Sequence, residues 1–155
     1  MAKLLWDPSQ DPNKLIKEFA DGYYGPAGKE IRAYLDIMHN AVETSGDWLD
    51  LSSPPDAQFL SLETLIEGWA YLQAAEAAVS DNPVLLARVK IAQLPELFVF
   101  LVRWNELKDA ASCRGEEWPL SNAREDVYNE FMKVVQSSCI TPSAQTLSLL
   151  AKGGK

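Results

Sequence analysis

Histidine and cysteine are scarce in this sequence. Its 155 residues include one histidine, His39, and two cysteines, Cys113 and Cys139, which lie far apart. A structural zinc site takes four Cys or His ligands, so the chain lacks the residues for one and we expect no metal site. The glycines and lysine in "YYGPAGKE", residues 23–30, lack the spacing of the phosphate-binding fingerprints, and we expect no cofactor. A single disulfide between the two cysteines stays open.

Positive charge and long apolar runs are also in short supply. Lys and Arg total 14 against 22 Asp and Glu, which gives a formal net charge of −8 with the acids scattered along the chain. Because nucleic-acid binding needs a basic face, we do not expect a nucleic-acid partner. The apolar triplet Leu4-Leu5-Trp6 has no basic region before it and is too short for a signal peptide or a membrane span.

Alternation of apolar and polar residues, the mark of half-buried strands, is rare, whereas helix signals recur along the chain. Asp11-Pro12 and Asn82-Pro83 each combine an N-cap with a proline at the first helical position. Gly25 and Gly115 are helix ends. The sequence therefore predicts an all-α fold, a compact bundle of about five helices in one domain, with helices near 12–24, 26–44, 60–80, 83–113 and 121–137.

The expected helices carry apolar stripes at helical spacing. We expect the long fourth helix to kink near Pro95, because proline removes a backbone donor and clashes with the preceding turn. Ser121 is the expected cap of the fifth helix, and Thr141 is a weak cap near the end. The residues expected on the apolar faces of the first two helices are Leu15, Ile16, Phe19, Tyr23, Ile31, Tyr34, Leu35, Met38 and Val42.

No catalytic constellation is evident. His39 has no nucleophile or carboxylate motif beside it, and a structural or solvent role fits it better than catalysis. Glu116-Glu117 are adjacent residues, whereas glycoside hydrolysis needs two carboxyl groups facing each other across a cleft. We therefore assign no catalytic residue and do not expect this chain by itself to be an enzyme.

Two tryptophans fall in expected loops beside acidic residues, Trp48 in "GDWLD" and Trp118 in "EEWPL". A rigid exposed ring next to hydrogen-bonding acids suits stacking on a sugar face, which makes both residues candidates for carbohydrate contact. The more common role of such a residue is to anchor its loop to the core. Both interpretations stay open at the level of sequence.

Several segments carry a resemblance to a known family: Leu4 to Pro8 ("LLWDP"), Glu18-Phe19, Tyr23 to Ala27 ("YYGPA"), Ala87-Arg88-Val89 and Leu94-Pro95. The chain resembles an uncharacterised helical domain at the C-terminal side of large bacterial proteins related to glycoside hydrolases, many of them from Bacteroidetes. The resemblance covers most of the chain and is most specific over the first 40 residues.

The resemblance implies carbohydrate processing in a secreted or periplasmic protein whose catalytic carboxylates lie in an upstream barrel. Leu4, Leu5 and Trp6 would then mark the junction that docks this domain on its upstream neighbour. Residues 1–155 would form one helical domain excised from that larger protein, a non-catalytic accessory domain that buttresses the barrel or edges its substrate cleft. The alternative is an independent helical module that binds another protein through an apolar groove.

Overall fold

The computed structural model describes residue 7 and the ranges 9–46 and 53–153. These residues contain helices and no strand, so the all-α fold class is confirmed, with more helices than the five expected. The helices are α2 (Pro12–Tyr24), the 3₁₀ turn η1 (Gly25–Ala27), α3 (Gly28–Ser45), α4 (Leu62–Ala77), α5 (Pro83–Val102), α6 (Trp104–Arg114), α7 (Arg124–Ser137) and α8 (Ala144–Lys152).

The local helix signals explain most of these boundaries. The Asp11 side chain accepts a hydrogen bond from the Asn13 N–H at 2.9 Å, and Asn82 accepts from the N–H groups of Val84 and Leu85. Gly25 ends α2 and Gly115 ends α6, with φ of 58° and 70°, a region in which glycine is favoured because it has no Cβ. Both predicted proline-containing starts and both glycine ends are confirmed.

Two predicted caps are wrong. The fifth expected helix begins at Arg124 rather than 121, because the Ser121 hydroxyl is occupied by the Ala123 N–H before the helix starts. The last helix is capped by Ser143, which accepts from the Thr146 N–H, and not by Thr141. Near the last helix Thr141, Ser143 and Thr146 stand close together, and the short-range pattern does not choose among them.

The long fourth helix is interrupted at Arg103, which separates α5 from α6. Arg103 leaves helical geometry with φ −101° and ψ 23°, and its guanidinium donates to the carbonyl oxygens of Pro55 and Leu60, 43 to 48 residues away in the chain. The break therefore depends on a tertiary contact. Pro95 lies inside α5, and the kink expected there stays a prediction.

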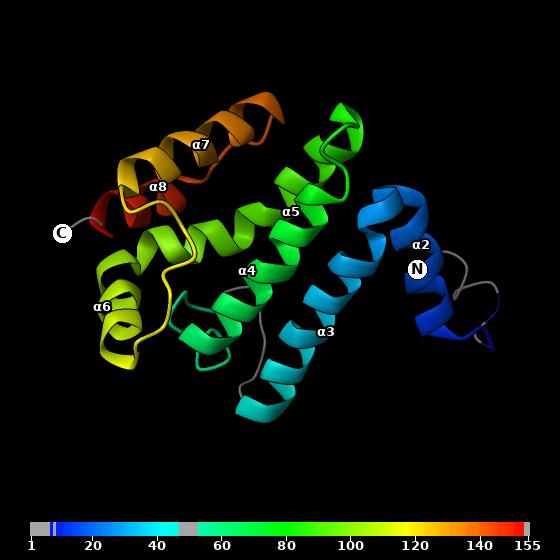
Figure 1. The fold of residues 1–155 in the computed structure, drawn as a ribbon, viewed down its shortest axis with the longest axis horizontal. Helices are drawn as coiled ribbons and strands as arrows, with labels where there is room; N and C mark the ends of the chain where they lie inside the picture. The colour runs from blue at the N-terminus through cyan, green and yellow to red at the C-terminus, as the bar shows by residue number, and fades with distance from the viewer. Residues whose placement is uncertain (1–6, 8, 47–52, 154–155) are drawn as a thin grey trace.

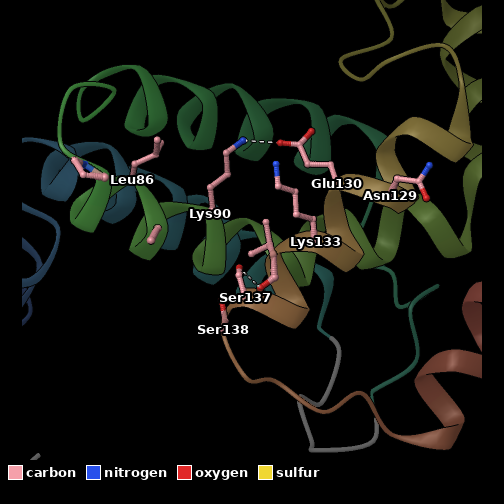
Figure 2. A pocket seen from close by; sticks show the side chains of 10 residues that line it. Leu86, Lys90, Asn129, Glu130, Lys133, Ser137 and Ser138 are labelled. Atoms are coloured by element: carbon pink, nitrogen blue, oxygen red, sulfur yellow. Dashed lines mark hydrogen bonds and ion pairs between the residues drawn. The ribbon is translucent and has the colours of Figure 1, made fainter.

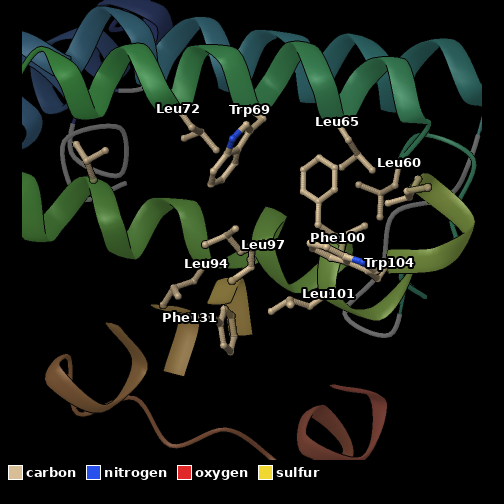
Figure 3. Packing of buried hydrophobic residues seen from close by; sticks show 14 of the residues in the cluster. Leu60, Leu65, Trp69, Leu72, Leu94, Leu97, Phe100, Leu101, Trp104 and Phe131 are labelled. Atoms are coloured by element: carbon tan, nitrogen blue, oxygen red, sulfur yellow. The ribbon is translucent and has the colours of Figure 1, made fainter. Parts of the chain in front are cut away.

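The helices from α2 to α5 lie side by side in chain order, followed by α7 against α5 (Figure 1). The main core lies between α4, α5 and α7. Figure 3 shows Leu65, Trp69 and Leu72 on α4 facing Leu97 and Phe100 on α5, with Phe131 of α7 on the other side. This region sets the stability of the fold, since its apolar side chains exclude water most completely.

Burial is unevenly shared among the helices. Six residues are buried in α4 and eight in α5, whereas α2 contributes Ala20 and α3 contributes Gly28 and Ile31. The α2–α3 pair therefore forms one edge of the molecule and leaves most of its surface uncovered within the described part of the chain.

Candidate functional site

Four of the residues singled out from sequence lie outside the residues that the structure describes. They are the proposed docking residues Leu4, Leu5 and Trp6 and the sugar-stacking candidate Trp48. Their roles stay predictions.

Trp118 is half-buried and anchors the loop between α6 and α7. Its ring meets those of Phe100 and Trp104 edge-on, with centroids 5.6 and 5.1 Å apart, and its indole N–H donates to the Ser121 carbonyl at 3.3 Å. This arrangement fits the anchoring interpretation. Sugar stacking on the remaining exposed part of the ring stays a prediction.

The other candidate residues are not brought together. Glu116 and Glu117 are exposed on the loop after α6, and His39 lies on α3. Cys113 and Cys139 are free and exposed. Among the described residues there is no group of three His, Cys, Asp or Glu side chains placed to hold a metal ion.

The structure instead reveals an exposed apolar face on α2 and α3. Four large apolar side chains there remain open to solvent: Ile16 at 45%, Phe19 at 64%, Tyr23 at 40% and Leu35 at 39% exposure. We call these four residues the α2–α3 face. A soluble chain usually keeps large contiguous apolar patches covered, so a cluster of this kind marks a contact surface.

Aromatic contacts hold part of this face in place. The rings of Phe19 and Tyr23 are stacked, with centroids 5.4 Å apart and planes within 10°. The Arg88 guanidinium lies 4.4 Å from the centre of the Tyr23 ring and donates to the Tyr23 carbonyl at 2.6 Å. Because Arg88 belongs to α5, this contact ties the end of α2 to the core and presents the two rings as a rigid platform.

A groove of about 810 Å³ runs between α2 and α3. Its lining is Pro12, Asn13, Leu15, Ile16, Phe19, Arg32, Leu35, Asp36 and His39. Apolar side chains therefore share the groove with one cation, one carboxylate and the imidazole. The Arg32 Nε is buried without a hydrogen-bond partner in the described part of the chain, an unfavourable state for a buried donor.

Helical spacing did not by itself indicate the environment of these residues. Ile16, Phe19 and Tyr23 recur at helical spacing on one apolar face, and their side chains are exposed. Periodicity identifies an apolar stripe but not the surface that covers it. The signal that points to function combines a regular apolar stripe with its exposure to solvent. The stripe is visible in the sequence, but its exposure is visible only in the structure.

A second groove, of about 600 Å³, lies between α5 and α7 (Figure 2). Leu86, Ala87 and Val134 supply apolar walls, and Lys90 and Glu130 line it too. The Lys90 ammonium lies 2.8 Å from carboxylate oxygens of both Glu76 and Glu130. Burial lowers the pKa of Lys90, but its bonds to Glu130 and Glu76 outweigh that effect and raise it overall.

A known family model matches the start of the chain. Residues 1–36 match the family model described as a domain of unknown function, DUF4838. The chain is similar to that family over α2, η1 and the first part of α3. The later segments that suggested the resemblance, around Arg88 and Pro95, lie beyond the match. No curated protein and no solved structure matches the chain.

No helix in the described ranges combines the length and the apolar character needed to cross a bilayer.

Proposed function

We propose that this chain is a non-catalytic accessory domain of a secreted or periplasmic glycoside-hydrolase-type protein, docked through its α2–α3 face on the preceding domain of the same polypeptide. The catalytic carboxylates belong to that preceding domain. The accessory domain buttresses it or forms an edge of its substrate cleft.

The observation that carries the docking proposal is the exposure of the α2–α3 face. Phe19 and Tyr23 are stacked into a rigid surface, so covering them costs little further side-chain entropy. Full burial of one such side chain contributes about 1.5–3 kcal/mol, which gives a partner domain a substantial gain from docking here.

The family match includes the proposed docking surface. Ile16, Phe19, Tyr23 and Leu35 all fall within the matched residues 1–36. The exposed face therefore belongs to the segment that this chain has in common with the family, which in sequence also includes the proposed docking residues Leu4, Leu5 and Trp6. A surface in that position suits a neighbour that is covalently linked, because a short tether makes its effective concentration high.

The alternative function is an independent helical module that binds another protein. The observation in its favour is the α5–α7 groove, whose apolar walls are open at the surface and do not belong to α2 or α3. An amphipathic helix is the partner that such a groove fits.

Hydrogen exchange tests the docking proposal by comparing this chain with a longer protein that includes the upstream region. Exchange at amides of α2 should slow in the longer protein. Phe19→Ala should destabilise the longer protein by about 1–3 kcal/mol more than it destabilises this chain, because the ring is buried only after docking. Leu147→Ala is the control, since Leu147 is 43% exposed on α8, a helix that packs on α5.

Equal exchange in both proteins, together with equal effects of Phe19→Ala, would refute docking through this face. Activity assays complete the test. Residues 1–155 should give no turnover of aryl glycosides or polysaccharides above buffer, whereas the longer protein should give turnover. Turnover by the short chain that is lost when one carboxylate is neutralised would show that the domain is itself an enzyme.

A further inference from the structure

Glu96 is a carboxylic acid in the interior of the helical core. It lies near the middle of α5 and is 2% exposed. Its sequence neighbours Leu94 and Leu97 are buried with it. An ionised carboxylate in such surroundings is strongly disfavoured unless charges or hydrogen bonds compensate for its lost hydration.

The space for the carboxyl group comes from a glycine on the neighbouring helix. A Cβ at Gly68 of α4 would lie 3.2 Å from both Glu96 carboxylate oxygens and 3.2 Å from Cε2 of Tyr34 on α3. The carboxyl group, the Gly68 backbone and the Tyr34 ring therefore meet at one point. This point lies where α3 packs on α4, beside the Glu96 side chain of α5.

The groups that face Glu96 do not compensate for an ionised carboxylate. Tyr34 approaches from α3 and the Trp69 backbone N–H from α4, but both carboxylate oxygens are buried without a hydrogen-bond partner among the described residues. Among the described residues no Lys, Arg or His forms an ion pair with Glu96. A neutral, protonated carboxyl group suits this junction far better than a charged one.

We propose that Glu96 is a proton-dependent latch: its neutral carboxyl group allows α3 to pack on α4 beside Gly68, and its ionisation loosens that junction. The proposal concerns the internal packing of this chain and does not depend on the identity of a docking partner. The element loosened by ionisation is α3, whereas Arg88 also ties the end of α2 to α5.

The electrostatics of the site agree with this geometry. Burial raises the pKa of Glu96 from 4.5 to about 8, against a smaller lowering by Tyr34 and by the Trp69 backbone. The folded state therefore holds a proton that the unfolded state has lost between pH 4.5 and about 8. The stabilisation is complete below pH 4.5 and is lost as the pH rises to about 8, where the folded state ionises too.

The direct test is an NMR titration of the Glu96 side-chain carboxyl carbon in the full 155-residue chain. We expect a midpoint well above the ordinary glutamate value, and a further rise in Tyr34→Phe because the hydroxyl favours the ionised form. A midpoint near 4.5 would overturn the proposal, even if every substitution at Glu96 failed to fold.

The second test measures what ionisation does to the structure. Glu96→Gln keeps the size of the side chain and removes its proton equilibrium, so its unfolding equilibrium should change less between pH 5 and pH 8 than that of the unaltered chain. The difference between the two should approach about tenfold per pH unit. Glu67→Gln, at an exposed position on α4, is the control for removing one charge.

Hydrogen exchange then locates the loosening. After correction for the intrinsic effect of pH, amides of α3 should lose protection between pH 5 and pH 8 in the unaltered chain but not in Glu96→Gln. Amides of α7 should change little in either protein. Identical pH dependence of α3 and α7, or of the two proteins, would overturn the latch and leave Glu96 as a buried acid without a mechanical role.

Discussion

At the scale of single residues, two glycines of the α2–α3 pair have opposite surroundings. Gly22 has open space where a Cβ would stand, with nothing within 4 Å. A Cβ at Gly28 would lie 2.7 Å from the Ala20 carbonyl oxygen, a backbone atom that cannot move aside independently. Gly28 therefore allows the start of α3 to approach α2 closely, which fixes the geometry of the pair that carries the exposed face.

We predict that Gly28→Ala lowers stability by about 1–3 kcal/mol, the usual cost of forcing extra volume into a packed site. Gly22→Ala, the matched control within α2, should instead raise stability by about 0.5–1 kcal/mol, because alanine is the better helix former and meets no obstacle. Urea unfolding of both variants measures the two changes. Shifts of the same sign would show that backbone packing at Gly28 does not limit the approach of the helices.

At the scale of helices, Lys90 connects three elements. Its ammonium lies on α5 between Glu76 of α4 and Glu130 of α7, and Gln93 donates to the second oxygen of Glu76 at 2.8 Å. The Lys90 side chain is 24% exposed, whereas that of Glu130 is 58% exposed, so solvent weakens the outer half of this bridge. The contact with α4 is the stronger half.

We predict that Lys90→Met costs about 1–2 kcal/mol, because it leaves two carboxylates facing each other across α5 without their shared cation. Lys17→Met is the matched control. Lys17 pairs with Asp21 on the exposed surface of α2, and its loss should cost under about 0.5 kcal/mol. Thermal unfolding at low ionic strength measures both, and equal small shifts would show that Lys90 adds nothing beyond a surface pair.

At the scale of the whole molecule, the stable core and the proposed docking surface lie in different parts. α4 and α5 hold most of the buried apolar residues, including Leu65, Val89 and Phe100 at 0% exposure. α2 buries one residue, Ala20, and depends on η1, α3 and the Arg88 contact for its position. A region with so few buried contacts opens more readily than the core.

We therefore predict that native-state hydrogen exchange separates the two regions in the isolated chain. Amides of α2 should exchange through partial opening, at a lower free energy than amides of α4 and α5, which should exchange only on global unfolding. Exchange measured at increasing sub-denaturing urea distinguishes the two modes. Equal free energies of opening for α2 and α5 would contradict this division.

Much of the fold could be predicted from the sequence because the interactions that set the helix boundaries are local. Asp11, Asn82, Gly25 and Gly115 act on groups within a few residues of themselves, so the helix boundaries they set could be predicted without knowing any tertiary contact. The apolar stripe of α4 could be predicted for the same reason, since helical spacing follows from the backbone alone.

Features that depend on distant partners could not be predicted in this way. The break at Arg103 arises from carbonyl groups of Pro55 and Leu60, and the burial of Glu96 depends on the space left by Gly68. An acid within the run "LPELF" was a visible signal, but its environment was not. The exposure of the α2–α3 face could not be predicted either. Phe19 and Leu65 both lie on apolar stripes at helical spacing, yet Phe19 is exposed and Leu65 is buried.

The sequence by itself determined that this chain is helical, where most of its helices begin and end, and that it lacks the ligands for a zinc site of the usual Cys and His kind. The tertiary structure decided which apolar stripes form the core, which one stays exposed on α2 and α3, and which carboxyl group is enclosed. The physical reason is the distance along the chain over which each interaction acts. Caps and helical periodicity act over one or two turns, whereas burial depends on what every other part of the chain leaves uncovered.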